Sequence, residues 1–202
     1  KEYRRQRQMC IRDRCYRDED SRKDRQPEFT QLDLEISNGS PEIVREITES
    51  IVKNLLTDVY ELEVKIPFIE MTYDEAINTY GTDKPDLRIK STIKDFTNIF
   101  KKTEIKFIKS AIENNGFVKG FVTEDILSRS QIDELDEIVK NSGSNGLGWF
   151  KIENNEVSGP LSKIINEDEK NNILKLGEGM LIFQSGTKEI YPILDILRRS
   201  IF

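Results

Sequence analysis

CYRDEDSRKDRQPEFTQLDLEIS, residues 15–37, changes abruptly from a dense charge run to a regular alternation of polar and apolar side chains. Its first eleven positions hold four acidic and four basic residues. Residues 29–36 then follow the two-residue period of a β-strand, with one apolar face and one polar face. The polar face carries Gln31, Asp33 and Glu35. A partner strand over residues 16–20, joined through a charged loop that ends at Pro27, completes a predicted antiparallel hairpin.

The composition is typical of a globular chain whose chemistry does not rest on histidine. The 202 residues include 31 basic and 37 acidic side chains, for a net charge of −6, and no histidine. Cys10 and Cys15 have no second cysteine pair with which to hold zinc, so free thiols are expected. No apolar run suits a membrane span or a secretory signal, which makes cytoplasmic residence the expectation. Any catalysis must use carboxylates, Arg and Lys, or a bound metal.

The charge is distributed unevenly along the chain. Residues 1–25 hold ten Lys and Arg against six Asp and Glu, whereas the rest of the chain is acidic. Such a basic segment is consistent with a local site for phosphate or nucleic acid, and equally with a solvated tail. Residues 1–13 show neither helical nor strand periodicity, and we interpret them as non-native or unassigned sequence.

Beyond the hairpin the pattern predicts an α+β fold. A helix begins after Ser40 with Pro41 in its first turn, and a shorter helix runs from Thr72 to Gly81. We place a domain boundary after the turn-rich residues 81–88. The rest reads as one compact unit of short strands and helices. The strands are expected at 117–122, 148–153 and 179–183, and the helices at 107–114, 130–142 with Ser130 as cap, 162–174, and 188–202 with an interruption near Pro192.

The polar face of the hairpin is the stretch that can support chemistry. Arg17 and Glu19 on one strand would face Gln31, Asp33 and Glu35 on the other, and strands position polar groups more rigidly than loops do. A guanidinium in such a place can bind a phosphoryl oxygen and a carboxylate with its fixed fork of donors. The pattern alone is equally consistent with a solvated face that carries incidental ion pairs.

Three segments in unbroken order resemble one family. YRDEDSRKDRQPEFTQLDLE, from residue 16, is similar to motif 2 of the class II aminoacyl-tRNA synthetases, in the form found in bacterial-type aspartyl-tRNA synthetases. MTYDEAINTYGTDKPDLR resembles the segment that follows in that family. LSRSQIDELDEIVKNSGSNGLGWFKIE and GPLSKII resemble the family's inserted GAD domain, which it shares with a subunit of the tRNA-dependent amidotransferases. The resemblance covers about residues 14 to 202.

The resemblance implies an architecture. It is a partial antiparallel catalytic sheet, with the motif 2 hairpin and helices over residues 14–88, followed by a GAD-type α+β insertion over residues 89–202. It also implies roles for individual residues. Arg17 matches the arginine that binds the ATP α-phosphate and the aspartate carboxylate, and Asp33 matches a carboxylate near the ligand's amino group. The other matched residues are Asp18, Glu19 and Gln26 for ATP, and Glu19, Asp20, Arg22 and Arg25 for the tRNA acceptor end.

The implied protein is an aspartate–tRNA ligase that uses ATP with Mg²⁺. It would act on L-aspartate and the acceptor end of tRNA(Asp), with tRNA(Asn) as a further substrate left open, in a homodimer free of the membrane. Two other readings stay open: a non-catalytic synthetase-like module that binds tRNA or protein, and a fragment of an amidotransferase subunit, which the motif 2 stretch disfavours. Motifs 1 and 3 are not found in the 202 residues, so we expect the isolated chain to form no adenylate.

Overall fold

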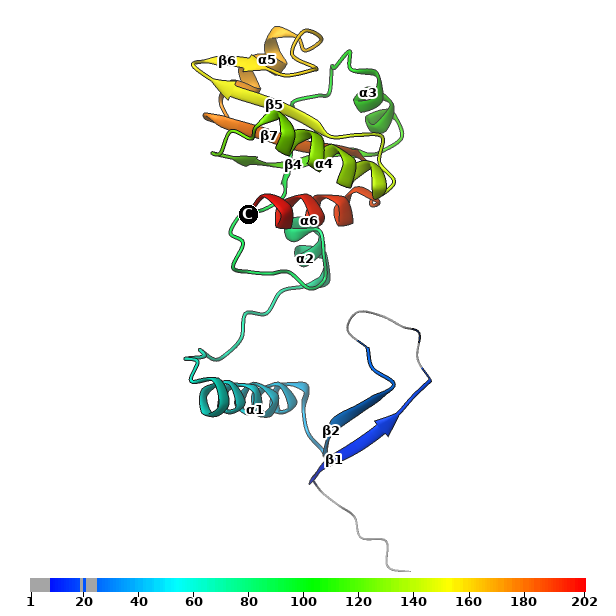
Figure 1. Cartoon of the computed structure of the whole chain (residues 1–202), viewed down its shortest axis with the longest axis vertical. Coiled ribbons are helices and arrows are strands. Elements are labelled where there is room, and N and C mark those ends of the chain that lie inside the picture. Colours follow the sequence, from blue (N-terminus) through cyan, green and yellow to red (C-terminus); the bar gives the residue numbers. More distant parts are fainter. Residues whose placement is uncertain (1–7, 19, 21–24) are drawn as a thin grey trace, which may run out of the picture. The chain divides into compact units, whose positions relative to one another are not determined.

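The computed structural model describes residues 8–18, 20 and 25–202, with the backbone alone described for residues 8–11 (Figure 1). The chain forms two compact units that divide between Glu70 and Met71, an N-terminal unit and a C-terminal unit. Both contain antiparallel strands and helices, so the α+β prediction is confirmed. The assignment of domains to residues 14–88 and 89–202 stays a prediction, and the compact units divide earlier in the sequence.

A two-stranded hairpin begins the N-terminal unit. Strand β1 spans Gln8–Tyr16 and strand β2 spans Glu28–Ile36, paired antiparallel over their whole lengths. The second strand lies where its alternation predicts. The first was placed wrongly, because it ends at Tyr16, where the predicted strand began, and it includes residues 8–13 that were expected to show no strand pattern. Backbone pairing with β2 decides the conformation there, since the side-chain pattern of residues 8–13 is weak.

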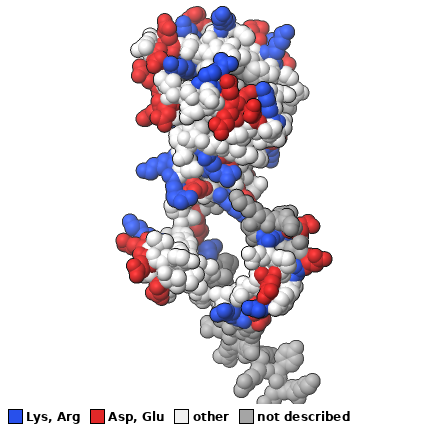
Figure 2. Space-filling view, viewed as in Figure 1, with Lys and Arg blue, Asp and Glu red and all other residues white. Residues whose placement is uncertain are grey.

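Helix α1, Pro41–Tyr60, follows the hairpin in the sequence. The Ser40 side chain accepts a hydrogen bond from the Ile43 backbone N–H, and Pro41 occupies the first turn, so the predicted start is confirmed. None of the 20 residues of this helix is buried. Its apolar residues Ile43, Val44, Leu55 and Val59 are exposed, and Figure 2 shows a broad uncharged surface over this helix.

The C-terminal unit starts with helix α2, Tyr73–Tyr80. Thr72 and Glu75 form the reciprocal hydrogen bonds of a capping box, and Gly81 ends the helix in a left-handed conformation at φ 82°. A Cβ atom at Gly81 would lie 2.4 Å from the Tyr191 carbonyl oxygen, so only glycine fits where α2 meets the last helix. The predicted helix from Thr72 to Gly81 is confirmed.

The remaining elements surround one five-stranded antiparallel sheet in the order β3-β4-β7-β5-β6. The strands are β3 Lys94–Asp95, β4 Phe117–Thr123, β5 Gly148–Glu153, β6 Glu156–Ser158 and β7 Gly179–Gly186. The helices are α3 Lys106–Glu113, α4 Arg129–Asn141, α5 Glu167–Leu174 and α6 Ile190–Ile201. The three longer strands were predicted from their apolar runs, whereas the short β3 and β6 were not.

Two apolar clusters lie on opposite faces of this sheet. One cluster includes Ile132 of α4 and Leu194 of α6, and the other includes Ile108 of α3 and Ile173 of α5. Neighbouring residues of the central strand β7 alternate between them, since Ile182 belongs to the first cluster and Leu181 to the second. The sheet is thus covered on both faces, which explains why residues 180–183 form a continuous apolar run.

Helices α4, α5 and α6 each differ from the sequence prediction in one feature. The cap of α4 is Ser128, paired with Gln131 in a capping box, and not Ser130, which lies inside the helix. Helix α5 begins only after Asn166, whose side chain caps the backbone N–H of Glu169. Pro192 does not interrupt α6, because it lies in the first turn, where its missing N–H removes no helical hydrogen bond.

Candidate functional site

The hairpin register decides which side chains share its polar face. Cys15 lies opposite Phe29 and Asp13 lies opposite Gln31, so residues of odd number on both strands project to one side. Asp33 and Glu35 continue that side along β2, while Thr30 and its neighbours of even number project to the other. The predicted separation into a polar and an apolar face is therefore confirmed for β2.

Arg17 lies one residue beyond β1, at the loop end of this face. Its backbone N–H donates a hydrogen bond to the Pro27 carbonyl oxygen at 2.8 Å, which extends the hairpin pairing by one step. Its guanidinium carbon lies 5.0 Å from the centre of the Phe29 ring, within the range of a cation–π contact. Its Nη2 donates a hydrogen bond to Gln31 Oε1 at 3.2 Å. The Phe29 and Gln31 side chains of β2 thus contact the guanidinium, while Pro27 holds the backbone of Arg17.

Gln31 connects Arg17 to the carboxylate further along the same strand. Its Oε1 accepts hydrogen bonds from Arg17 and, at 3.8 Å, from the Cys15 thiol, while its Nε2 donates to Asp33 Oδ1. A carboxamide can make both contacts at once because it carries an acceptor and a donor. The structure therefore brings together Arg17 and Asp33, the two residues expected at the amino acid, with one amide between them.

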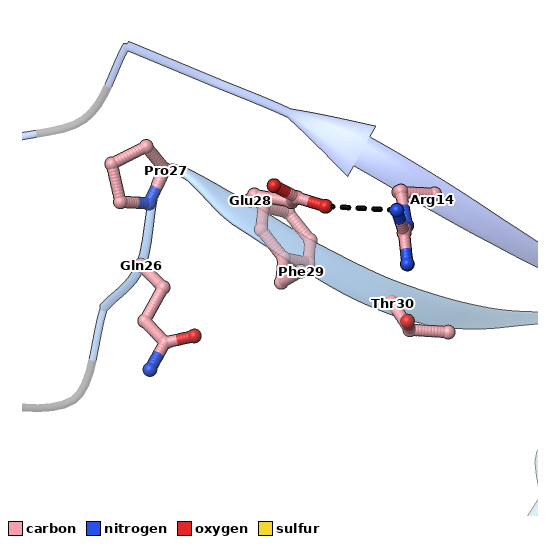
Figure 3. A pocket seen from close by; sticks show the side chains of 6 residues that line it. All are labelled: Arg14, Gln26, Pro27, Glu28, Phe29 and Thr30. Carbon is pink, nitrogen blue, oxygen red and sulfur yellow. Dashed lines mark ion pairs between the residues drawn. The ribbon is translucent and has the colours of Figure 1, made fainter.

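A hollow of about 700 Å³ lies at the loop end of the hairpin (Figure 3). Its lining residues are Arg14, Gln26, Pro27, Glu28, Phe29 and Thr30. Arg14 and Glu28 form an ion pair at 3.1 Å across the two strands, with more than half of each side chain exposed, so it adds little stability. Gln26, expected at ATP, lines the hollow, and Phe29 both lines it and contacts Arg17.

The other predicted site residues belong to the connection between the strands. Asp18, Asp20 and Arg25 are exposed and lie near the hairpin end. Glu19 and Arg22 fall outside the described residues, so their predicted contacts stay predictions. Among residues 8–18, 20 and 25–202, no three Asp, Glu, Cys or His side chains converge to hold a metal ion.

The sequence analysis did not assign two residues of this face to the site. Phe29 and Cys15 face each other in the register and both contact the Arg17–Gln31 pair, yet neither was assigned to the site. The period of β2 contained the signal for Phe29, because residues 29, 31 and 33 share one face. Cys15 could not be placed from sequence, since its side depends on a strand that was predicted to start one residue later.

Comparison with known proteins shows the family of this chain. A family model described as tRNA synthetases class II (D, K and N) matches residues 7–178, which include both strands of the hairpin. The chain belongs to this family. The resemblance of the motif 2 segment is thereby confirmed at the level of the family.

Curated relatives of this synthetase chain are aspartate–tRNA ligases, some of them named for both tRNA(Asp) and tRNA(Asn). The aspartate–tRNA(Asp/Asn) ligase of Hydrogenobaculum sp. (strain Y04AAS1) is 43% identical over 190 residues, 92% of this chain and 32% of the relative. The aspartate–tRNA ligase of Shouchella clausii (strain KSM-K16) is 40% identical over 193 residues, 92% of this chain and 33% of the relative. That of Thermosipho africanus (strain TCF52B) is 46% identical over 160 residues, 78% of this chain and 27% of the relative. The chain spans about a third of the length of the relatives it matches.

Proposed function

We propose that this chain is part of an aspartate–tRNA ligase, in which the hairpin contributes to the amino acid activation site. The observation that supports this most directly is the chain of contacts from Arg17 through Gln31 to Asp33 on one strand face. The strand holds a guanidinium, which can bind an anionic phosphate, and a carboxylate, which can bind an ammonium group, at fixed places. The aspartate–tRNA ligases that align with most of the chain support the same assignment.

The proposed reaction has two displacements. A carboxylate oxygen of L-aspartate attacks the α-phosphorus of ATP, the bond to pyrophosphate breaks, and aspartyl-adenylate forms. A hydroxyl of the terminal ribose of tRNA(Asp) then attacks the acyl carbon and AMP leaves. Arg17 neutralises charge on the α-phosphate and holds the aspartate carboxylate, while Asp33 lies near the ammonium group. Positioning and charge neutralisation supply the acceleration, which suits a segment without histidine.

The remaining assignments complete the proposal. Gln26, Asp18 and Glu19 contact ATP, which brings Mg²⁺ on its phosphates. Glu19, Asp20, Arg22 and Arg25 meet the acceptor end of the tRNA. The intact ligase is a cytoplasmic homodimer, and the C-terminal unit contains its GAD insertion. None of the described helices is long and apolar enough to cross a membrane. Some relatives are named for aspartate–tRNA ligation alone and others for both tRNA(Asp) and tRNA(Asn). Aminoacylation of tRNA(Asp) and tRNA(Asn) transcripts by the intact ligase would therefore assign its tRNA specificity.

Substitution of Arg17 tests the proposal in a full-length ligase that contains this segment. Arg17→Ala should lower kcat/KM for ATP–pyrophosphate exchange. The lost transition-state stabilisation should be roughly 3–5 kcal/mol, the scale of removing a preorganised charge-stabilising donor. Arg12→Ala is the matched control, because Arg12 is exposed and projects to the opposite side of β1. A loss below about tenfold for Arg17→Ala, or an equal loss for both variants, would contradict the assigned role.

A further inference from the structure

The sheet of the C-terminal unit has an open edge beside β4. Strand β3 pairs with β4 at two positions only, Lys94 with Gly120 and Asp95 with Lys119, whereas β4 continues to Thr123. A hollow of about 430 Å³ lies where this pairing stops. We call it the β4-edge hollow, and its lining residues are Lys90, Ser91, Thr92, Lys94, Val122, Thr123, Glu124, Asp125 and Phe202.

The backbone on both sides of the β4-edge hollow is anchored. On one side, Arg198 donates hydrogen bonds to the carbonyl oxygens of Ile89 and Ser91 at 3.2 and 3.4 Å. On the other side, a Cβ atom at Gly179 of β7 would lie 2.1 Å from the carbonyl oxygen of Thr123, so the two backbones are in direct contact. The hollow is therefore framed by backbone held in place, which a site needs in order to position a ligand.

The two sides of this hollow carry opposite charges. Lys90 and Lys94 belong to the segment that leads into β3, and Glu124 and Asp125 belong to the turn after β4. Within the described part of the chain, none of these four side chains forms an ion pair or a side-chain hydrogen bond. By contrast, Lys151 of the same sheet is paired with a carboxylate at 2.8 Å. Two cations and two anions that are not paired with each other favour a ligand that carries both charges.

Strand β4 also presents backbone groups to the hollow. Residues of even number in β4 turn their backbone towards β3, since the Val118 carbonyl oxygen accepts a hydrogen bond from the Phe96 N–H at 2.8 Å. By the two-residue period, Val122 turns the same way, but it lies beyond the end of β3 and lines the hollow. Val122 can thus offer a ligand one N–H donor and one carbonyl acceptor.

An aromatic ring completes the lining. Phe202 is 50% exposed, and its ring centre lies 5.9 Å from that of Phe121 in an edge-to-face arrangement. Because Phe121 is only 1% exposed, this contact joins the Phe202 ring to the core of the unit. The hollow therefore combines opposite charges with an apolar contact, as sites for small polar molecules with an apolar part do.

We propose that the β4-edge hollow binds a free α-amino acid with an apolar side chain. The carboxylate of the ligand faces Lys90 and Lys94, its ammonium group faces Glu124 and Asp125, and its side chain contacts Phe202. The site does not depend on the ligase reaction, because neither ATP nor the hairpin takes part in it. Failure of ATP–pyrophosphate exchange would leave this site standing, and its own failure would leave the proposed function standing.

Saturation-transfer NMR titration of the 202-residue chain with L-leucine tests the proposal. Three analogues separate the charges: 4-methylpentanoate lacks the ammonium group, isopentylamine lacks the carboxylate, and N-acetyl-L-leucinamide lacks both. L-Leucine should bind saturably and about tenfold more tightly than each analogue, because it alone satisfies both sides of the hollow. The proposal is overturned if L-leucine shows no saturable binding up to about 10 mM, or if the uncharged analogue binds as tightly.

Two double variants assign each charge of the ligand to its side of the hollow. Lys90→Gln/Lys94→Gln should abolish the preference for L-leucine over isopentylamine, because the carboxylate then gains no charged contact. Glu124→Gln/Asp125→Asn should abolish the preference over 4-methylpentanoate for the corresponding reason. All four positions are exposed, so circular dichroism should show unchanged folding. Preferences that stay as in the wild type would place L-leucine elsewhere and overturn the proposal.

Matched controls remove the same charges outside the hollow. Lys163→Gln/Lys188→Gln and Glu134→Gln/Glu137→Gln change exposed residues of the same unit and should alter the Kd for L-leucine less than about twofold. Equal losses in the control variants and the hollow variants would contradict the proposal, since binding would then follow net charge. Tighter binding of L-aspartate than of L-leucine would also contradict it, because a second carboxylate would then replace the apolar contact with Phe202.

Discussion

At the scale of single residues, the amide of Gln31 has the most specific position in the hairpin. It accepts from Arg17 at 3.2 Å and donates to Asp33, so a residue without both functions would disconnect the two charged groups. In a full-length ligase we expect Gln31→Met to lower kcat/KM for aspartate. The loss of transition-state stabilisation should be about 1–3 kcal/mol, the cost of leaving hydrogen bonds to charged groups unmade. Gln31→Glu would keep the acceptor and remove the donor, and it should restore less than half of that loss. Wild-type kinetics in Gln31→Met would contradict this connection.

Asp136 offers a second residue-scale prediction, in the C-terminal unit. Its carboxylate accepts from Lys140 at 2.6 Å and from the Leu147 backbone N–H at 2.8 Å. The hydrogen bond from Lys140, and then that from Leu147, hold the pKa of Asp136 below its ordinary value of 3.8. Because the folded pKa lies below the unfolded one, this stabilisation is complete above about pH 4 and is lost as the pH falls through the folded pKa.

Urea unfolding of Asp136→Asn at several pH values tests that linkage. The variant should be less stable than the wild type at pH 7, since asparagine can still accept from Leu147 but cannot pair with the charge on Lys140. The difference in the free energy of unfolding should shrink as the pH falls below about 4. A difference that stays constant from pH 7 to about pH 2 would show that Asp136 acts through packing and not through its charge.

At the scale of elements, helix α1 predicts the behaviour of the chain in solution. Val44, Leu55 and Val59 are 43%, 54% and 62% exposed and lie on one side of the helix. Exposed apolar patches on soluble proteins favour association. We therefore expect the 202-residue chain to associate with rising concentration, and Val44→Gln/Leu55→Gln/Val59→Gln to shift its sedimentation coefficient towards that of the monomer.

A second triple variant separates apolar contact from loss of helix. Glu46, Asn54 and Asp58 are exposed on the same helix, and their replacement by glutamine keeps the helix while leaving the apolar stripe intact. Association should persist in that control. If both triple variants sediment as the wild type does, the stripe of α1 plays no part in the association.

The elements also show what the sequence could predict. The alternation of β2 placed Gln31 and Asp33 on one face, since a strand period needs no knowledge of distant residues. Strand β1 was missed over residues 8–13 because its conformation depends on pairing with β2 and its own pattern is weak. The start of α4 was assigned to Ser130 where Ser128 caps it, because both serines precede a polar residue by three, although only Ser128, with Gln131 after it, fits the capping-box pattern.

At the scale of the whole C-terminal unit, one buried arginine joins segments far apart in the sequence. Arg198 of α6 is 0% exposed, donates to the carbonyl oxygens of Ile89 and Ser91 at 3.2 and 3.4 Å, and pairs with Asp195. Its guanidinium carbon lies 5.2 Å from the ring centre of Tyr80. No local pattern predicted this burial, since the sequence shows only two adjacent arginines near the end of an amphipathic helix.

Arg198→Ala should cost about 3–5 kcal/mol in the free energy of unfolding, because it removes the buried partner of Asp195 and leaves the part-buried carbonyl oxygens of Ile89 and Ser91 without their donor. Arg199→Ala is the control. Arg199 pairs with the same Asp195 at 2.8 Å, but its side chain is 55% exposed, so its removal should cost less than about 1 kcal/mol. Equal costs for the two variants in urea unfolding would show that burial does not determine the contribution of these arginines.

The first and last helices of the C-terminal unit lie against each other. Tyr191 of α6 donates a hydrogen bond to Asn78 of α2, Lys119 of β4 contacts both side chains, and the Cα of Gly81 lies against the α6 backbone. Asn78 and Tyr191 are 113 residues apart in the sequence. The two helices can therefore meet only when the sheet and helices between them have folded, so their contact reports on the integrity of the whole C-terminal unit.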